Sequence, residues 1–433
     1  MRTDFSPALL ADPAMRASEA VIRKCVHCGF CTATCPTYVL LGDELDSPRG
    51  RIYLMKDMLE GERQPTPEIV KHVDRCLSCL SCMTTCPSGV NYMHLVDHAR
   101  AYIEQRYRRP WRERMLRAVL ARVLPYPRRF RLALRLARLA RPARPLLGAG
   151  PFGAMLDLAP RTVPPAMPRR DAPVPGRRGR VALLGGCAEP VLRPDYRAAA
   201  VRVLNRAGFD VVFAPGEGCC GALVHHMGRD DEGLAAARRN VDAWTRLLDG
   251  DGLDAILVTA SGCGTTIKDY GFMLRNDPAY ADKAARVSAL ARDVSEFLAE
   301  AELPAGEPLG ITVAYHGACS LQHGQRVTDA PKRLLAAAGY AVRIPREAHL
   351  CCGSAGTYNI LQPELAGQLG ARKTAELARL GADVIATGNV GCAVQIGRRA
   401  AVPVVHTIEL VDWATGGPMP RALAGVAARG GQA

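Results

Sequence analysis

Several features that mark other classes of protein are scarce in this chain. Aromatic residues make up only 5% of its 433 residues, and no apolar run approaches the roughly 18 residues that a membrane-spanning helix needs. The N-terminal segment MRTDFSPALLADPAMRASEA includes Asp4 and Asp12 and lacks an apolar core of the length found in secretory signal peptides. We therefore expect a cytoplasmic protein whose contact with a membrane is peripheral.

Motifs for nucleotides and nucleic acids are also missing. The chain has no GxGxxG unit between a strand and a helix, and the segment GSAG at 353–356 lacks a P-loop lysine. The net charge of +14 is concentrated in residues 101–150, which hold fourteen arginines and two acidic residues. Because no nucleic-acid-binding motif accompanies this charge, we expect no nucleic acid partner, and no flavin or NAD on this chain.

Cysteine, by contrast, is abundant, with 16 residues. In a cytoplasmic protein, clustered cysteines bind metal more often than they form disulfides. The first eight form two runs, CVHCGFCTATCP and CLSCLSCMTTCP, which share the spacing C-x2-C-x2-C-x3-C-P. This spacing is typical of bacterial ferredoxins with two [4Fe–4S] clusters.

The spacing also predicts that each run completes the cluster of the other. Three thiolates of one tight loop reach three irons of a cube, and the fourth cysteine, carried away at the proline, reaches the second cube. The alternatives are buried free thiols or two structural zinc sites, although zinc usually takes two separated cysteine pairs. We predict one cluster on Cys25, Cys28, Cys31 and Cys86, and the other on Cys35, Cys76, Cys79 and Cys82.

Such a pair of cubes predicts electron transfer. Irons that are fully ligated by thiolates offer no open position to a substrate. We therefore expect no catalytic residue on this chain.

Three kinds of sequence follow one another along the chain. In residues 1–100, short helices surround the two cysteine runs with little hydrophobic core of their own. Residues 101–180 contain amphipathic helices, broken at prolines, and end in a linker rich in proline and arginine. Residues 181–310 and 311–433 are two copies of one unit in which β-rich runs alternate with helices. The predicted fold class is thus a small α-helical dicluster ferredoxin domain followed by two duplicated α/β domains with parallel strands.

The basic helices have a predicted orientation. Met115, Val119 and Val123 recur at helical spacing and predict an apolar face, with Leu116 and Leu120 beside them. The next helix is expected to gather its arginines on a cationic face: Arg128, Arg131, Arg135 and Arg138.

The remaining eight cysteines form two sets that repeat at a nearly fixed offset. The first three cysteines of one set recur in the second set at the same distance along the sequence. The fourth recurs at a slightly shorter distance. We expect them at the ends of parallel strands or in the loops that follow, where open α/β sheets place their sites. The two sets are Cys187, Cys219, Cys220 and Cys263, and Cys319, Cys351, Cys352 and Cys392.

Three hypotheses stay open for these two sets. Each set holds a further cluster, or forms a thiol-based redox or partner-docking site, or serves only as small apolar residues. Histidines nearby are expected to be structural and not ligands: His225, His226, His316 and His349.

Together these motifs resemble one family of redox proteins. The segments CVHCGFCTATCPTYVLLGDELDSPRGRIYL, CPSGV, GCCGA, LCCGSAGTY and, above all, ASGCGTTIKDYGFMLRNDPAYADKA are similar to those of glycolate oxidase (glycolate dehydrogenase) iron–sulfur subunits. The resemblance covers nearly the whole chain. In the fuller cysteine-rich CCG motif the last cysteine begins a CxxC, whereas Thr266 and Gln395 stand at the matching positions here.

The resemblance implies an oxidoreductase complex in which separate flavin subunits, with FAD, oxidise glycolate to glyoxylate. This chain would pass electrons toward a membrane acceptor such as quinone, from the cytoplasmic face of the inner membrane, where the arginine helices would contact anionic lipid. The related subunits of lactate-utilisation, glycerol-3-phosphate dehydrogenase and heterodisulfide reductase complexes leave other substrates open. A thiol- or metal-based redox sensor is the non-enzyme alternative.

Overall fold

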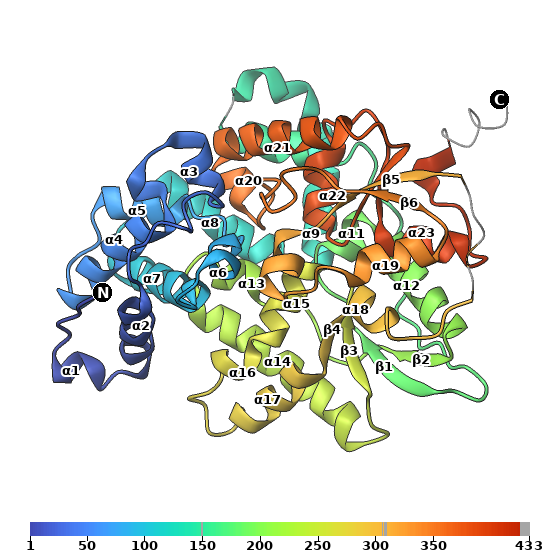
Figure 1. Ribbon diagram of the computed structural model, residues 1–433, viewed down its shortest axis with the longest axis horizontal. Helices are drawn as coiled ribbons and strands as arrows, with labels where there is room; N and C mark the ends of the chain where they lie inside the picture. Colours follow the sequence, from blue (N-terminus) through green and yellow to red (C-terminus); the bar gives the residue numbers. More distant parts are fainter. Residues whose placement is uncertain (149, 305, 307–309, 425–433) are drawn as a thin grey trace.

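The computed structural model describes residues 1–148, 150–304, 306 and 310–424. A helical N-terminal part lies beside two α/β parts (Figure 1). The basic helices connect the N-terminal part to the α/β parts along the chain. The predicted fold class is confirmed. The ends of the two predicted α/β domains, at residues 305, 307–309 and 425–433, lie outside the described residues, as does residue 149.

The helices of the N-terminal part begin where the sequence supplies a start signal. The first five each begin at a proline, whose missing N–H costs nothing in a first turn. Asp12, Ser47 and Thr66 precede three of them and accept a hydrogen bond from a backbone N–H of the first turn. The helices are α1 (Pro7–Leu10), α2 (Pro13–Lys24), α3 (Pro36–Leu41), α4 (Pro48–Glu60), α5 (Pro67–Asp74), α6 (Ser81–Thr85) and α7 (Tyr92–Arg106).

A hydrophobic core lies between these helices, so the prediction of little core in residues 1–100 is wrong. Ile52, Met55 and Leu59 form the buried face of α4, as their helical spacing indicates. They pack in one cluster with residues of α2, α5 and α7. Nearly all of this core lies within residues 1–100, and Tyr102 and Ile103 near the end of α7 complete it. Its residues come from four helices that are separate in the sequence, so no single segment reveals it.

The basic segment forms α8 (Trp111–Val123), α9 (Pro127–Ala140), the short turn η2 (Arg141–Leu147) and α10 (Pro151–Leu158). In α8 the buried residues include Leu116 and Leu120, whereas Met115 and Val119 are each 45% exposed. The predicted apolar face was therefore displaced by one residue. The reason is tertiary: Leu116 and Leu120 pack against Ile360 of the second α/β part.

Two sheets of identical topology form the α/β parts. The first has the order β2-β1-β3-β4 and the second the order β6-β5-β7-β8, and every pairing between named strands is parallel. This agreement confirms the internal duplication. The strands are β1 (Gly179–Leu183), β2 (Phe209–Val212), β3 (Ala255–Val258) and β4 (Ala291–Asp293), then β5 (Thr312–His316), β6 (Ala341–Arg343), β7 (Val384–Thr387) and β8 (Val404–His406).

Helices cover both sheets. The first α/β part contains α11 (Glu189–Leu192), α12 (Pro194–Arg206), α13 (Ala222–His225), α14 (Asp230–Asp249), α15 (Ser261–Lys268), α16 (Tyr270–Met273), α17 (Ala281–Leu290) and α18 (Val294–Leu298). The second contains the turn η3 (Ser320–Gly324), α19 (Ala330–Ala337), α20 (Tyr358–Leu361), α21 (Pro363–Ala378), α22 (Val390–Gly397), α23 (Thr407–Ala414) and the turn η4 (Arg421–Leu423).

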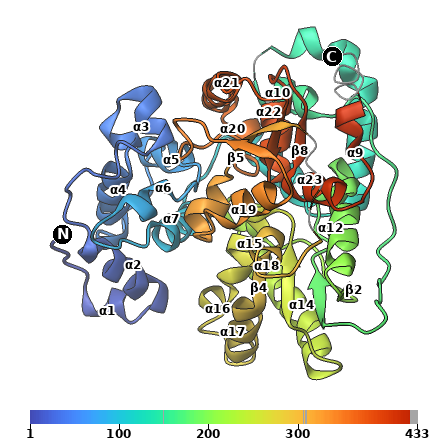
Figure 2. The same ribbon diagram turned by 45° about the vertical axis from the view of Figure 1, so that its right-hand side comes forward.

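The two α/β parts pack directly on each other (Figure 2). Arg202 and Arg206 of α12 form ion pairs with the buried Asp412 of α23. Nearer the strand ends, the Nε2 atom of His406 hydrogen-bonds the carbonyl oxygen of Thr259 at 2.8 Å. These contacts hold the carboxyl ends of both sheets toward one shared region.

Candidate metal centres

Cys25, Cys28, Cys31 and Cys86 line one small cavity of about 30 Å³, together with Cys82. We call these first four cysteines the outer cage. Cys25 directly follows α2, and the loop after it turns through two left-handed residues, His27 at φ 56° and Gly29 at φ 83°. This turn brings the thiols of the loop onto one side.

Cys35, Cys76, Cys79 and Cys82 line a second cavity of about 20 Å³, which we call the inner cage. Its loop has the same shape, because Ser78 and Leu80 are left-handed at the positions that match His27 and Gly29. The fourth cysteine of each run therefore lies with the three of the other run.

The donor chemistry of both cages suits a bound cation. Burial raises the pKa of Cys31 to about 11. Burial and neighbouring thiols also raise the pKa values of Cys79 and Cys82 well above the ordinary value. Four thiolates cannot share such a cage without a positive centre to balance them, and iron bound as a cluster supplies that charge.

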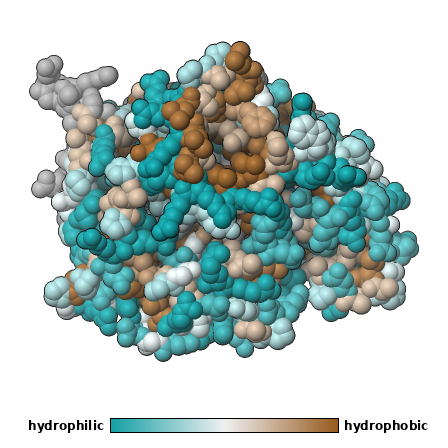
Figure 3. Space-filling view, turned by 180° about the vertical axis from the view of Figure 1, so that it is seen from behind, coloured by the Kyte–Doolittle hydropathy of each residue, from teal (hydrophilic) through white to brown (hydrophobic). Residues whose placement is uncertain are grey.

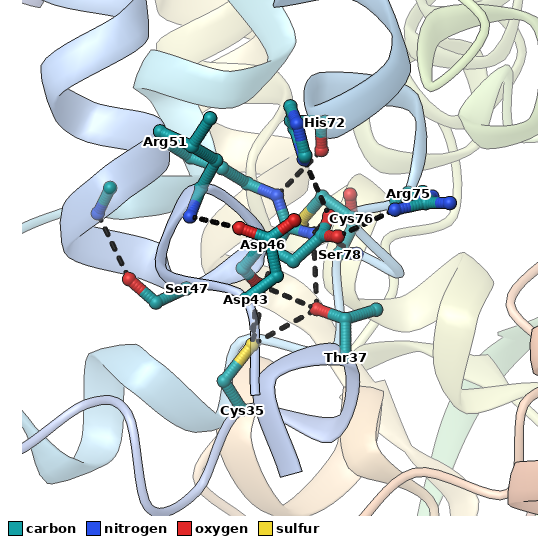
Figure 4. A network of polar contacts seen from close by, with 12 residues as sticks. Cys35, Thr37, Asp43, Asp46, Ser47, Arg51, His72, Arg75, Cys76 and Ser78 are labelled. Carbon is teal, nitrogen blue, oxygen red and sulfur yellow. Dashed lines mark hydrogen bonds and ion pairs between the residues drawn. The ribbon is translucent and has the colours of Figure 1, made fainter. Parts of the chain in front are cut away.

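A buried guanidinium lies beside the inner cage (Figure 4). The Nη2 atom of Arg51 is 3.0 Å from Asp46 Oδ1, and its Nη1 atom is 3.8 Å from the sulfur of Cys35. The Nε atom donates to the carbonyl oxygen of His72 at 2.6 Å. Arg75 also pairs with Asp46, at 2.7 Å. Arg51 thus places a permanent positive charge next to a cysteine of the inner cage, where solvent does not screen it.

A far larger cavity, of about 690 Å³, lies between the two α/β parts and the N-terminal part. The eight cysteines of the duplicated units all line it. Four of them follow closely after the ends of β1, β3, β5 and β7, and the two adjacent pairs stand in the loops after β2 and β6. The predicted placement at strand ends is thereby confirmed.

The two cysteine pairs are held in the same way. Gly221 and Gly353 follow the pairs with φ values of 86° and 85°. A Cβ atom at either glycine would lie 2.8 Å from a carbonyl oxygen of the facing helix, that of Gly233 or that of Ala366. Glycine is therefore required for the pair to approach its helix, and both copies keep it.

The sulfurs within each set are close to one another. In the first set, contacts from Cys187 and Cys220 lower the pKa of Cys219 to about 3. In the second set, the sulfur atoms of Cys319 and Cys351 are 3.7 Å apart. All of the cysteines are free thiols. A group of neighbouring buried thiols, one of which loses its proton readily, is suited to binding a soft metal centre.

The histidines near these cysteines differ in their partners. His226 pairs with Asp97 of α7 at 3.1 Å, and His225 pairs with Asp230 at 2.8 Å. His316 has no such partner among the described residues: it is buried, and its ring lies beside Cys352 and Cys392. Burial and the nearby Lys373 lower the pKa of His316 well below its ordinary value. Sequence reasoning set this histidine aside, although its place at the end of a strand, just before Cys319, was a usable signal.

The inner cage and the large cavity adjoin each other. Cys76, Leu77 and Ser78 line the large cavity together with the duplicated cysteines. Leu77 and Cys79 belong to one hydrophobic cluster with Cys351, and Cys319 packs against that cluster. The inner cage and the second cysteine set are thus joined through buried contacts.

The outer wall of the large cavity is apolar and comes from the basic helices. Phe130 and Leu134 of α9 and Leu156 of α10 line it, and it opens near Leu136 and Phe152, which are 56% and 49% exposed. Hydrophobic residues gather around a hollow in the upper part of the back face (Figure 3).

Comparisons with known proteins agree with this architecture. Residues 24–90 match the 4Fe-4S dicluster domain, and residues 181–268 and 313–397 match the cysteine-rich CCG domain. The chain is thus an iron–sulfur protein that joins a dicluster domain to two CCG domains.

It is 43% identical over 418 residues to the glycolate oxidase iron–sulfur subunit of Escherichia coli, covering 96% of this chain and 99% of that one. It is also 31% identical over 433 residues to the probable glycolate oxidase iron–sulfur subunit of Bacillus subtilis, covering 93% and 96%. The chain belongs to the family of glycolate oxidase iron–sulfur subunits, which are components of an oxidoreductase.

The fold also has a counterpart among solved structures. A hypothetical protein from Helicobacter pylori superposes with a TM-score of 0.57 at 12% identity, over 95% of this chain and 74% of that one. Among the described residues, no helix combines the length and the apolar character needed to cross a membrane.

Proposed function

We propose that this chain is the electron-transfer subunit of a complex that oxidises glycolate to glyoxylate. FAD-containing partner subunits bind the glycolate, and this chain passes the electrons on to an acceptor. The support is the 43% identity to a subunit of that name across nearly the full length of both chains.

The proposed ligands follow the cavities. The outer cage and the inner cage each hold one [4Fe–4S] cluster, and each four-cysteine set of the CCG domains holds a further one. When bound, the clusters supply one-electron redox chemistry. The chain's own residues fix the thiols, exclude water and set the surrounding charge.

One observation of the structure supports electron transfer over redox sensing: the contact of the inner cage with the second cysteine set. Cys79 and Cys351 belong to one buried hydrophobic cluster, and Thr84 hydrogen-bonds His323 across the same junction at 2.8 Å. A protein that merely sensed redox state would not need two metal centres joined through a dry contact. A relay from the outer cage toward the large cavity does need it.

The acceptor that suits the large cavity is a membrane quinone. Its apolar wall leads from the surface at Leu136 and Phe152 to the cysteine pairs. On α9, the exposed leucines Leu132, Leu136 and Leu139 lie among exposed arginines, including Arg128 and Arg135. An apolar stripe flanked by arginine fits the surface of an anionic bilayer, which would be the cytoplasmic face of the inner membrane.

The substrate is tested on the whole complex. The complex is purified anaerobically from its native cell, and glycolate, lactate and glycerol 3-phosphate are added separately. We expect glycolate alone to reduce the flavin and then the clusters of this chain, followed by absorbance and electron paramagnetic resonance. Reduction by lactate or glycerol 3-phosphate instead would reassign the substrate, and no copurifying flavoprotein would favour the sensor hypothesis.

The membrane contact is tested by vesicle binding. The complex carrying Leu136→Asp and Leu139→Asp should lose sedimentation with phosphatidylglycerol vesicles, whereas Ile344→Asp, a change at an exposed aliphatic residue just after β6, should retain it. Binding of the unaltered complex should weaken with salt, because Arg128 and its neighbours contribute through charge. Equal binding of all three forms would remove the membrane from the proposal.

A further inference from the structure

His316 ends β5, an interior strand of the second sheet, and only 1% of its surface is exposed. Neither of its ring nitrogens has a hydrogen-bond partner among the described residues. A buried ring in this condition gives up its hydrogen bonds to water without replacing them. Native proteins rarely keep such a group unless it has a further role.

The nearest candidates for that role are two sulfurs. A ring nitrogen of His316 and the sulfur atoms of Cys352 and Cys392 all lie within 4.8 Å of one another, and all three side chains are buried. Imidazole nitrogen and thiolate sulfur commonly ligate one metal centre together. The three groups also come from three different segments, so local chain geometry alone does not bring them together.

Gln395, which stands where the fuller motif has a fifth cysteine, does not compete for this place. Its Nε2 atom donates to the carbonyl oxygen of Ala366 at 2.8 Å, and its Oε1 atom accepts from Asn359 at 3.4 Å. The amide is used within the fold. The fifth donor of the second set therefore comes from a strand and not from the helix that carries Cys392.

The first α/β part lacks this donor. Leu184 is the counterpart of His316 in the first copy, because the offset between these two positions is the one that relates Cys187 to Cys319. Leu184 is buried in the apolar cluster that also contains Cys220. The fold thus accepts a purely apolar residue here, so an imidazole is not needed for packing.

We propose that His316 is a fifth ligand of the iron–sulfur cluster held by Cys319, Cys351, Cys352 and Cys392, so that one iron of this cluster takes a donor beyond the four thiolates. This inference rests on the proposed function, in which each set holds a cluster. The second CCG domain then binds its cluster through nitrogen and sulfur, and the first through sulfur alone. A neutral imidazole adds a ligand without adding negative charge, which distinguishes the two clusters electronically.

The test measures nitrogen coupling and metal content on the same samples. The whole complex is prepared with ordinary histidine and with ¹⁵N-histidine, and pulsed paramagnetic resonance is recorded in the state in which the second-domain cluster is paramagnetic. We expect the coupling of a directly bound imidazole, changed by the label and absent in His316→Leu. His349→Gln, a matched change in the loop before Cys351, should leave the coupling intact.

His316→Cys guards against a variant that merely fails to fold. It offers a thiolate in the same place, so it should bind as much iron as the unaltered chain, without nitrogen coupling and with a lower midpoint potential. His316→Leu should keep its iron on the four cysteines, as the first CCG domain does with Leu184 at the matching position, and should lose only the nitrogen coupling. A coupling that survives in His316→Leu, or full iron with no histidine coupling in the unaltered chain, overturns the ligand assignment alone. Iron of only about eight per chain, four for each dicluster cube, overturns the clusters of the CCG domains and the ligand with them.

Discussion

The outer and inner cages share one loop geometry and differ in their surroundings. Beside the exposed Cys28 of the outer cage, Val26 and Phe30 are 65% and 66% exposed. Cys79 of the inner cage is buried and packs with Cys351 of the second CCG domain. The inner cage therefore faces the rest of the chain and the outer cage faces the surface. Under the proposed function, the outer cage is the one that would meet the flavin partner.

The arginines near the two cages differ in the same way. Arg49 lies beside the outer cage, pairs with Glu44 at the surface, and is one-third exposed. Arg51 lies beside the inner cage, and neither it nor its partner Asp46 has more than 1% of its side chain exposed. Solvent screens the first pair and not the second, so only Arg51 is expected to exert a strong field on its cage.

The largest effect on electron transfer is expected from removing the inner cluster, which connects the outer cage to the CCG domains. Cys79→Ala should lose about four irons per chain, the content of one cube, and should reduce electron delivery to any acceptor to background. Glycolate should still reduce the flavin of the same complex, which serves as the internal control. Iron and sulfide analysis, with stopped-flow absorbance, checks both results. Acceptor reduction at the normal rate would show that electrons bypass the inner cage.

The next effect compares the two arginines directly. Arg51→Met leaves the Asp46 carboxylate buried with Arg75 as its remaining arginine partner. A buried charge left with no partner typically costs about 3–5 kcal/mol of unfolding free energy, and we expect a loss below that range because Arg75 stays. Arg49→Met removes a screened surface pair and should change stability little. Anaerobic denaturant unfolding of the holo chain measures both. The potential of the inner cluster should also fall in Arg51→Met, because a positive charge that favours the reduced form is lost.

A second substitution at Asp46 tests whether the loss of stability in Arg51→Met comes from its buried carboxylate partner. The double variant with Arg51→Met and Asp46→Asn should recover part of the stability, because it removes a buried carboxylate that has lost one of its two arginine partners. Equal destabilisation by Arg49→Met and Arg51→Met would contradict the contrast in burial.

The arrangement of the two cages could be predicted from the sequence, because it follows from the spacing of the cysteines in the two runs. Two loops with the same C-x2-C-x2-C register fold alike, and the duplicated units were visible from cysteines that recur at a nearly constant offset. In α4, the helical spacing of Ile52, Met55 and Leu59 matched the buried face, because the core that covers it is local.

Features decided by long-range packing were not accessible in this way. The buried face of α8 was displaced by one residue because Ile360, which is distant in the chain, selects Leu116 and Leu120. The exposed leucines of α9 and the large cavity likewise depend on how the basic helices cover the CCG domains. Arg51 was overlooked because a basic residue in a helix is usually solvated, and only the tertiary structure reveals its burial.

A smaller effect is expected at the exposed side of the outer cage. Phe30→Asp should weaken docking of the flavin subunit, since removing an exposed aromatic anchor and adding a charge typically costs about 1–2 kcal/mol, or roughly tenfold in affinity. Cluster reduction by glycolate should slow accordingly at low subunit concentration and recover at high concentration. Ile344→Asp, at an exposed position just after β6, is the control. An unchanged rate in Phe30→Asp would place the flavin subunit elsewhere.

The smallest effect concerns the contact of α7, which supports the inner cage, with the first CCG domain. Arg100 of α7 donates to the carbonyl oxygen of Cys76 and to Ser78, each at 2.6 Å. One helical turn before it, Asp97 faces His225 at 3.6 Å. Burial lowers the pKa of His225, but Asp230 and Asp97 outweigh burial and raise it above the ordinary value.

Because the folded-state pKa of His225 is raised, its stabilisation is fully present below the ordinary histidine pKa near 6.5 and is lost as the pH rises through the raised value. Hydrogen exchange in residues 92–106, corrected for the intrinsic effect of pH, should therefore increase at alkaline pH. His225→Gln should abolish this increase, while His349→Gln in the second CCG domain should keep it. Hydrogen exchange at the outer cage should not change with pH in this way, since His225 pairs with Asp97 and Asp230 and not with the outer cage. An equal change at the outer cage would contradict the proposed local effect of His225 on α7.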